Sequence, residues 1–126
     1  RVCIDSQASS ASPLRIVIRP GEQIPLQAGS ASKVLMAYMA KNVLTPILPA
    51  VTRLMKRTPS DLLAELGKVR AQGYSVSHGE RLLGLSAISA PIWDINEEVH
   101  YCLTVNGPSV RLQMHEKEFI KLVMND

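Results

Sequence analysis

The chain has little aromatic side-chain volume, little cysteine and no long apolar segment. Aromatic residues make up 4% of its 126 residues, so a hydrophobic core must be built from Leu, Ile, Val, Ala and Met. No apolar run approaches the roughly 20 residues that cross a bilayer, and residues 1–5 lack the apolar centre of a signal peptide. Cys3 and Cys102 form no CxxC pattern, which favours free thiols in a reducing compartment. We therefore expect a cytoplasmic protein that does not enter a membrane.

Concentrated positive charge is also missing. The net charge of +3 is spread along the chain, and its densest cluster is Arg53, Lys56 and Arg57. Recognition of nucleic acid requires a clustered basic stripe or a docking motif, and the sequence contains neither. The length suits one domain, residues 1–126, because no repeat, low-complexity tract or linker divides the chain.

One helix is marked at both ends. Thr58 is a capping residue, Pro59 suits the first helical position, and Gly73 suits the end. Between them, apolar residues follow the i, i+4, i+7 spacing of a buried stripe. These residues are Leu62, Leu66 and Val69, with Leu63 alongside.

Two further helices are expected. A largely buried helix is expected over 34–40, with Ser30 or Ser32 as its cap. Pro46 and Pro49 predict short turns after it, because proline interrupts helical hydrogen bonding. The last helix is amphipathic and contains Phe119, Ile120 and Val123.

The remaining periodicity is that of strands. Strand composition is found at 1–5, 14–19, 74–77, 85–93 and 99–106. Small residues over 6–13 and polar residues over 94–98 predict turns, and Pro91 indicates an edge or a bulge. Helices at both ends of a run of hairpin-connected strands indicate an α+β fold with an antiparallel sheet on which the helices pack.

Two places favour ligand binding. Residues 28–33 put small side chains, hydroxyls and free N–H groups at a helix start, which favours an anion. An ordinary capped helix packed on a sheet explains the same composition. Thr104 and Asn106 share one face of a strand that we expect to be central. Polar side chains there need partners, and a ligand, a helix end or buried water would each provide them.

Signatures of metal, cofactor and catalytic sites are lacking. His100 and Cys102 share a strand face, but no second pair of ligands stands at zinc-like spacing. The sequence contains no nucleophile elbow and no glycine-rich phosphate loop. His78, Glu80 and His100 are candidate general acids or bases, and spacing gives none of them a partner. We therefore expect neither an enzyme nor a bound metal or cofactor.

Four segments stand in an order and at spacings that are found together in one protein family. They read GEQIPLQAGSASK at 21–33, RAQGY at 70–74, GERLLGLSAISAPIWD at 79–94, and VNGP at 105–108 followed by Arg111. They resemble the signatures G-x-x-x-P-L-H-A-x-A-x-G-K, R-x-x-G-Y, G-E…G-x-x-x-I-A-A-P-I-x-D and V-S-G-P…R. These signatures belong to the effector-binding domain of IclR-type bacterial transcription regulators.

The resemblance implies a GAF-like fold, a curved antiparallel sheet with flanking helices and an effector pocket on one side. Family members bind small organic acids (keto, sugar or aromatic acids) and are usually homodimers or homotetramers. DNA would be bound only by a winged helix-turn-helix domain, which we expect to be missing here together with the family's opening helix and first strand. Carried over by position, the ligand-binding residues are Ser30, Ala31, Ser77, Ala87, Thr104 and Asn106.

The sequence departs from the family pattern near this implied pocket. Ser32 stands where glycine is usual, Asn106 where serine is usual, and Ser77 and His78 where acidic residues are common. Farther away, Gln27 replaces a frequent histidine. The effector is therefore expected to differ from those of well-known members. Two alternatives remain, namely an enzyme that uses the same pocket and a purely structural oligomerisation module.

Overall fold

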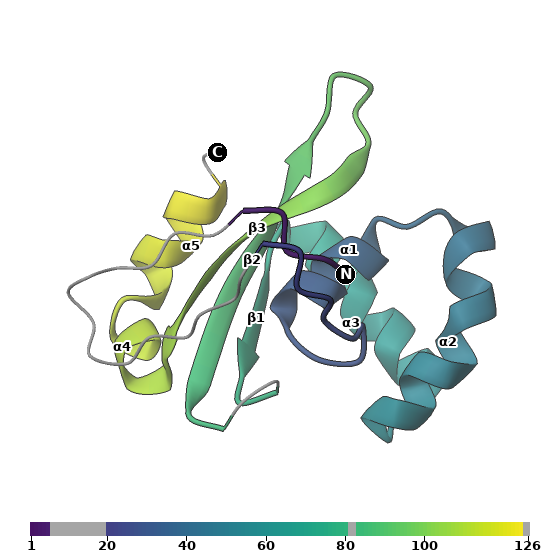
Figure 1. Cartoon of the computed structure of the whole chain (residues 1–126), viewed down its shortest axis with the longest axis horizontal. Helices are drawn as coiled ribbons and strands as arrows, with labels where there is room; N and C mark the ends of the chain where they lie inside the picture. The colour runs from purple at the N-terminus through teal and green to yellow at the C-terminus, as the bar shows by residue number, and fades with distance from the viewer. Residues whose placement is uncertain (6–19, 81–82, 125–126) are drawn as a thin grey trace.

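The computed structural model describes residues 1–5, 20–80 and 83–124. The elements of these segments are α1 (Ser30–Ala37), α2 (Lys41–Met55), α3 (Pro59–Gln72), β1 (Ser75–His78), β2 (Leu85–Trp93), β3 (Val99–Pro108), α4 (Ser109–Met114) and α5 (Glu116–Met124). The strands form one antiparallel sheet, with α1, α2 and α3 on one side and α4 and α5 on the other (Figure 1). The expected α+β class and antiparallel sheet are confirmed. Among the described residues, no helix is both long enough and apolar enough to cross a bilayer.

β2 is the middle strand of the described sheet. It pairs with β1 over Ser86–Ser89 and with β3 along its whole length. The irregularity expected near Pro91 is a register shift between Ile92 and Trp93. We expected Thr104 and Asn106 on the central strand, but in the described part of the chain β3 pairs with β2 alone.

The sheet separates two hydrophobic cores. On the side of α4 and α5, the buried core consists of Ile88, Ala90, Leu112 and Val123. On the other side, apolar residues of α1, α2 and α3 form a larger core around Val34, Met36 and Leu62. α1 lies directly on the sheet, while α3 packs against α1 and α2 against α3. The contact between α1 and the sheet therefore lies between the two cores.

α3 forms as the sequence predicts. The Thr58 Oγ1 atom accepts a hydrogen bond of 3.2 Å from the Asp61 N–H, and Gly73 ends the helix in the left-handed conformation. The stripe residues are at most 4% exposed, namely Leu62, Leu66 and Val69. Leu63 is 47% exposed, so the buried stripe is narrower than expected.

The expectation of short turns after α1 is wrong. Residues 41–55 form α2, a helix of 15 residues that contains Pro46 and Pro49. Both prolines are exposed, so water can bind the carbonyl groups that lack a helical partner. The opposite stripe is buried at i, i+4 and i+7, with Leu44, Leu48 and Val51. Burial of this stripe offsets the two missing hydrogen bonds.

α1 begins earlier than predicted. Ser30 is its first residue, and Gly29, with φ of 95°, occupies the capping position without a side-chain cap. Neither Ser30 nor Ser32 is therefore the cap. Of the strand expected at 1–5, the structure shows only a bridge between Val2 and Gln23. The turn expected at 6–13 and the strand expected at 14–19 lie outside the described residues.

The C-terminal end contains one helix that the sequence did not predict. β3 continues through Gly107 and Pro108, which we expected to end the strand earlier, and the short α4 follows. α5 is the expected amphipathic helix. Its Val123 is buried, and Phe119 and Ile120 pack against the same core.

Substitution of two glycines, one inside α3 and one at its end, tests how each position contributes to stability. Gly67→Ala should raise the free energy of unfolding by about 0.5–1 kcal/mol, since alanine is the better helix former and its Cβ would meet no atom within 4 Å. Gly73→Ala should lower it by at least about 1 kcal/mol, because a φ of +87° strains an L-residue. Urea unfolding of both variants measures the two effects. Stabilisation by Gly73→Ala would contradict its assignment as the helix end.

Candidate functional site

Three hydroxyl groups form a continuous chain between α1 and the sheet. The Ser30 Oγ atom lies 2.7 Å from Ser89 Oγ, which lies 2.7 Å from Thr104 Oγ1. Ser30 and Ser89 are fully buried, and Thr104 is half-buried. The chain therefore connects the first residue of α1 to β2 and then to β3.

The other candidate residues of the sheet lie in the next row of the same face. Ser77 of β1 is paired with Ala87 of β2, which is paired with Asn106 of β3. Each is two positions from the row that contains Ser75, Ser89 and Thr104, and alternate residues of a strand share a face. Ala31, 4% exposed, follows Ser30 on α1. The structure thus places all six candidates on α1 or on the face of the sheet that α1 covers, and their role in ligand binding stays a prediction.

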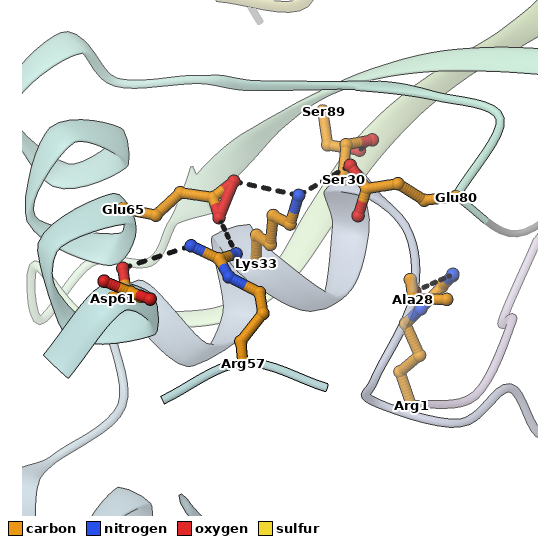
Figure 2. A network of polar contacts seen from close by, with 9 residues as sticks. All are labelled: Arg1, Ala28, Ser30, Lys33, Arg57, Asp61, Glu65, Glu80 and Ser89. Atoms are coloured by element: carbon orange, nitrogen blue, oxygen red, sulfur yellow. Dashed lines mark hydrogen bonds and ion pairs between the residues drawn. The ribbon is translucent and has the colours of Figure 1, made fainter. Parts of the chain in front are cut away.

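The start of α1 suits an anion. The first N–H groups of a helix have no partner within it, and no side chain caps α1. The Arg1 side chain adds positive charge here, donating from Nε to Ser32 Oγ at 2.7 Å and from Nη2 to the Ala28 carbonyl at 3.4 Å. Figure 2 shows Arg1 beside Ala28. The helix dipole and the guanidinium group both favour a carboxylate at this place.

The Cys102 thiol lies beside the hydroxyl chain. Its Sγ atom is 3.9 Å from the Ala31 carbonyl oxygen and 4.0 Å from Thr104 Oγ1. Burial raises the pKa of Cys102, and the hydrogen bond with Thr104 and the charge of Arg1 offset this only in part. The thiol is therefore protonated at neutral pH and adds a weakly polar wall to the site.

One helical turn from Ser30, Lys33 is buried in a network of charged groups (Figure 2). Its side chain is 5% exposed, and its Nζ atom lies 2.6 Å from Glu80 Oε2 and 2.9 Å from Glu65 Oε1. Arg57 is a second partner of Glu65. Burial acts to raise the pKa of Glu65, but the hydrogen bonds from Arg57 and Lys33 outweigh it, so the pKa is lowered. The Glu65 carboxylate therefore remains charged at neutral pH.

Two hollows open next to these elements. One of about 900 Å³ adjoins the charged network, and its lining includes Lys33, Arg57, Glu65, Lys68 and Glu80. Another, of about 590 Å³, lies beneath the hairpin that joins β2 and β3. None of the six candidate residues lines either hollow. Asn106 alone among the six is exposed, so the candidate row is reached from its β3 end.

The candidate acids and bases make no described contact with the hydroxyl chain. His78 Nδ1 lies 2.7 Å from the hydroxyl of Ser86, on the opposite face of the sheet. His100 Nε2 lies 3.0 Å from Glu98 and 3.7 Å from Asp94 in an exposed group. Glu80 is held by Lys33. The structure therefore assembles none of the three with the hydroxyl chain.

Sequence reasoning missed two parts of the site. Ser89, the central link of the hydroxyl chain, is two positions from the candidate Ala87, so strand alternation was the signal that identifies it. Lys33 entered only as the end of the small-residue segment. Its partners Glu65 and Glu80 lie on other elements, so no local pattern indicated the network.

Known proteins similar to this chain are transcription regulators. The family model described as the C-terminal region of the bacterial transcriptional regulator IclR matches residues 2–125. The HTH-type transcriptional regulator BhcR of Paracoccus denitrificans (strain Pd 1222) is 31% identical over 112 residues, which is 85% of this chain and 40% of that protein. The HTH-type transcriptional repressor AllR of Escherichia coli (strain K12) is 32% identical, over 84% of this chain and 41% of that protein. The chain spans about two fifths of the length of these curated relatives.

Solved structures have the same fold. The C-terminal domain of a Vibrio cholerae protein matches with a TM-score of 0.82 and 29% identity, over 98% of this chain and 74% of that chain. The C-terminal domain of the E. coli transcriptional regulator KdgR matches with a TM-score of 0.70 and 27% identity, over 82% of this chain and 67% of that chain. The family model covers nearly the whole chain. The chain therefore belongs to the IclR family of bacterial transcriptional regulators, and it corresponds to their C-terminal region.

Proposed function

We propose that this chain is the effector-binding and oligomerising domain of a bacterial transcription regulator. Its ligand is a small organic acid of the keto, sugar or aromatic class. The regulator works in the cytoplasm as a homodimer or homotetramer and contacts DNA through a helix-turn-helix domain that this chain does not include. The observation that supports the acid most directly is the hydroxyl chain from Ser30 through Ser89 to Thr104 at the uncapped start of α1.

The two ends of the site have different chemistry. The carboxylate of the acid binds the N–H groups and hydroxyls of Ser30 and Ser32, where the helix dipole favours negative charge. Thr104 and Asn106 bind the other end of the ligand by hydrogen bonds, since both are uncharged and can donate and accept. Ala31, Ser77 and Ala87 form the small-residue floor, where a large side chain would leave no room.

Regulation follows from a difference in affinity. If the acid binds one arrangement of subunits more tightly than another, it shifts the population of the regulator toward that arrangement. Equal affinity for both would shift nothing. The ligand therefore controls DNA binding through the equilibrium between arrangements.

Two alternatives to an effector-binding domain are tested by turnover and by binding of the acids. An enzyme that uses this pocket needs a general acid or base next to the ligand, yet His78 and His100 make their described contacts elsewhere, and the Glu80 carboxylate is paired with Lys33. Turnover of a bound acid that is lost on substitution of one of these residues would favour the enzyme. A purely structural oligomerisation module would bind none of the acids.

A thermal-shift screen tests acid binding. Pyruvate, gluconate and benzoate represent the three acid classes. A ligand at one hundred times its Kd stabilises the fold by about 2.7 kcal/mol, which raises the melting temperature by roughly 10 °C in a chain of this size. We expect at least one acid to raise the melting temperature of the wild-type chain, and Asn106→Leu and Thr104→Val to remove the shift.

Asn42→Leu is the matched control for this screen. Asn42 is an exposed asparagine of α2, so the same substitution there should leave the shift unchanged. An acid that stabilises Asn106→Leu as much as the wild type would contradict the role of Asn106. Absence of any shift in the wild type would leave oligomerisation as the function of the domain.

The two cysteines report on the site by their reactivity. Because burial raises the pKa of Cys102 and the thiolate is the reactive form, its alkylation rate should reach half-maximum at a higher pH than that of a free thiol such as N-acetylcysteine. A bound acid should slow the labelling of Cys102 further and leave Cys3 unchanged. Iodoacetamide labelling followed by peptide mass spectrometry from pH 7 to pH 10 measures both rates. Equal pH profiles would contradict the burial of the Cys102 thiol.

A further inference from the structure

Burial of the charged Lys33 side chain costs free energy. An ammonium group that loses its hydration is costly unless opposite charges surround it, and Lys33 has only 5% of its side chain exposed. It also lies in the first turn of α1, where the helix dipole disfavours a positive charge. Two carboxylates within 2.9 Å compensate for both penalties. A cation in this place thus requires both partners to be held in position.

The two partners come from different parts of the fold. Glu65 belongs to α3, and Glu80 lies two residues after the end of β1. Figure 2 shows Lys33 between them, with Ser30 and Ser89 close by. The ion pair with Glu80 therefore ties the first turn of α1, which carries Ser30 and Ala31, to the end of β1, which carries Ser77.

The hollow of about 900 Å³ adjoins the ion pair between Lys33 and Glu80. It lies beside Lys33, Glu65 and Glu80, so the Lys33 head group and its two partners border open space, while the other residues of the first turn of α1 are buried. Ion pairs of this type add little net stability, because desolvation cancels most of the attraction. Their directional contacts can nevertheless fix one arrangement of the elements that they join.

We propose that Lys33 is a positioning residue of the acid-binding site. Its ammonium group, held by Glu65 and Glu80, fixes the first turn of α1 at the end of β1. The N–H groups and hydroxyls of Ser30 and Ser32 are thereby kept at the right distance from Ser77 and Thr104. The part of this inference that concerns ligand affinity rests on the proposed function, whereas the part that concerns the geometry of α1 does not.

Hydrogen exchange of the chain without ligand tests the geometry. Lys33→Met keeps the side-chain length but removes the charge. Glu80→Gln removes the charge of one partner, whose side chain is 30% exposed. We expect amide exchange in the peptides that cover 28–34 and 75–80 to become at least tenfold faster in both variants. Exchange in α5 (Glu116–Met124) should stay as in the wild type, because α5 packs on the other face of the sheet.

Two variants serve as controls. Lys68→Met removes a positive charge from the lining of the same hollow, but Lys68 is exposed on α3, so exchange at 28–34 should not change. Lys33→Arg keeps the positive charge, and the adjoining hollow has room for the larger head group, so wild-type protection should be retained. Unchanged exchange in Lys33→Met and Glu80→Gln, or an equal increase in α5, would overturn the positioning role.

Ligand affinity gives the second measurement. For whichever of pyruvate, gluconate or benzoate binds the wild-type chain, calorimetry should show a Kd at least tenfold higher in Lys33→Met and unchanged in Lys68→Met. Equal Kd values for wild type and Lys33→Met would overturn the effect on the site. If none of the acids binds the wild type, the proposed function fails, and the exchange experiment alone decides whether Lys33 fixes α1.

Discussion

The short distance between the first turn of α1 and the sheet determines what this domain can contain there. Hydroxyls 2.7 Å apart connect Ser30 to Ser89 and Ser89 to Thr104, and such an approach is possible only when the facing residues are small. A leucine in place of Ser89 would push α1 away from β2, since protein interiors have little free volume. These hydroxyl groups can be buried because each has a hydrogen-bond partner. In the described part of the chain, no buried side-chain polar atom lacks one.

Much of this architecture could be predicted from local patterns. α3 is specified by residues within the helix itself, with Thr58 at one end, Gly73 at the other and a stripe between them. β2 was predicted with its observed bounds, and Thr104 and Asn106 share one face of β3 as strand alternation predicts. In these cases the deciding interactions lie within one element or between strands adjacent in the chain.

The failures share a different origin. Pro46 and Pro49 argue against a helix locally, yet α2 forms because Leu44, Leu48 and Val51 are buried against other helices. The start of α1 was misplaced because Gly29, and no hydroxyl side chain, occupies the cap. The charged network around Lys33 joins α1, α3 and the segment after β1. Tertiary contacts decide each of these features, and a single sequence contains no record of which distant residues meet.

Successive side chains of β3 face opposite sides of the sheet, so one strand takes part in both layers of the domain. Thr104 faces α1 and hydrogen-bonds Ser89, while its immediate neighbours Leu103 and Val105 pack on the core beneath α5. Because adjacent residues share one backbone, a shift of β3 at Thr104 would also move the two apolar residues that face the core beneath α5. A change at the hydroxyl chain would therefore alter the packing beneath α5 through the backbone of β3, without any direct contact between the hydroxyl chain and α5.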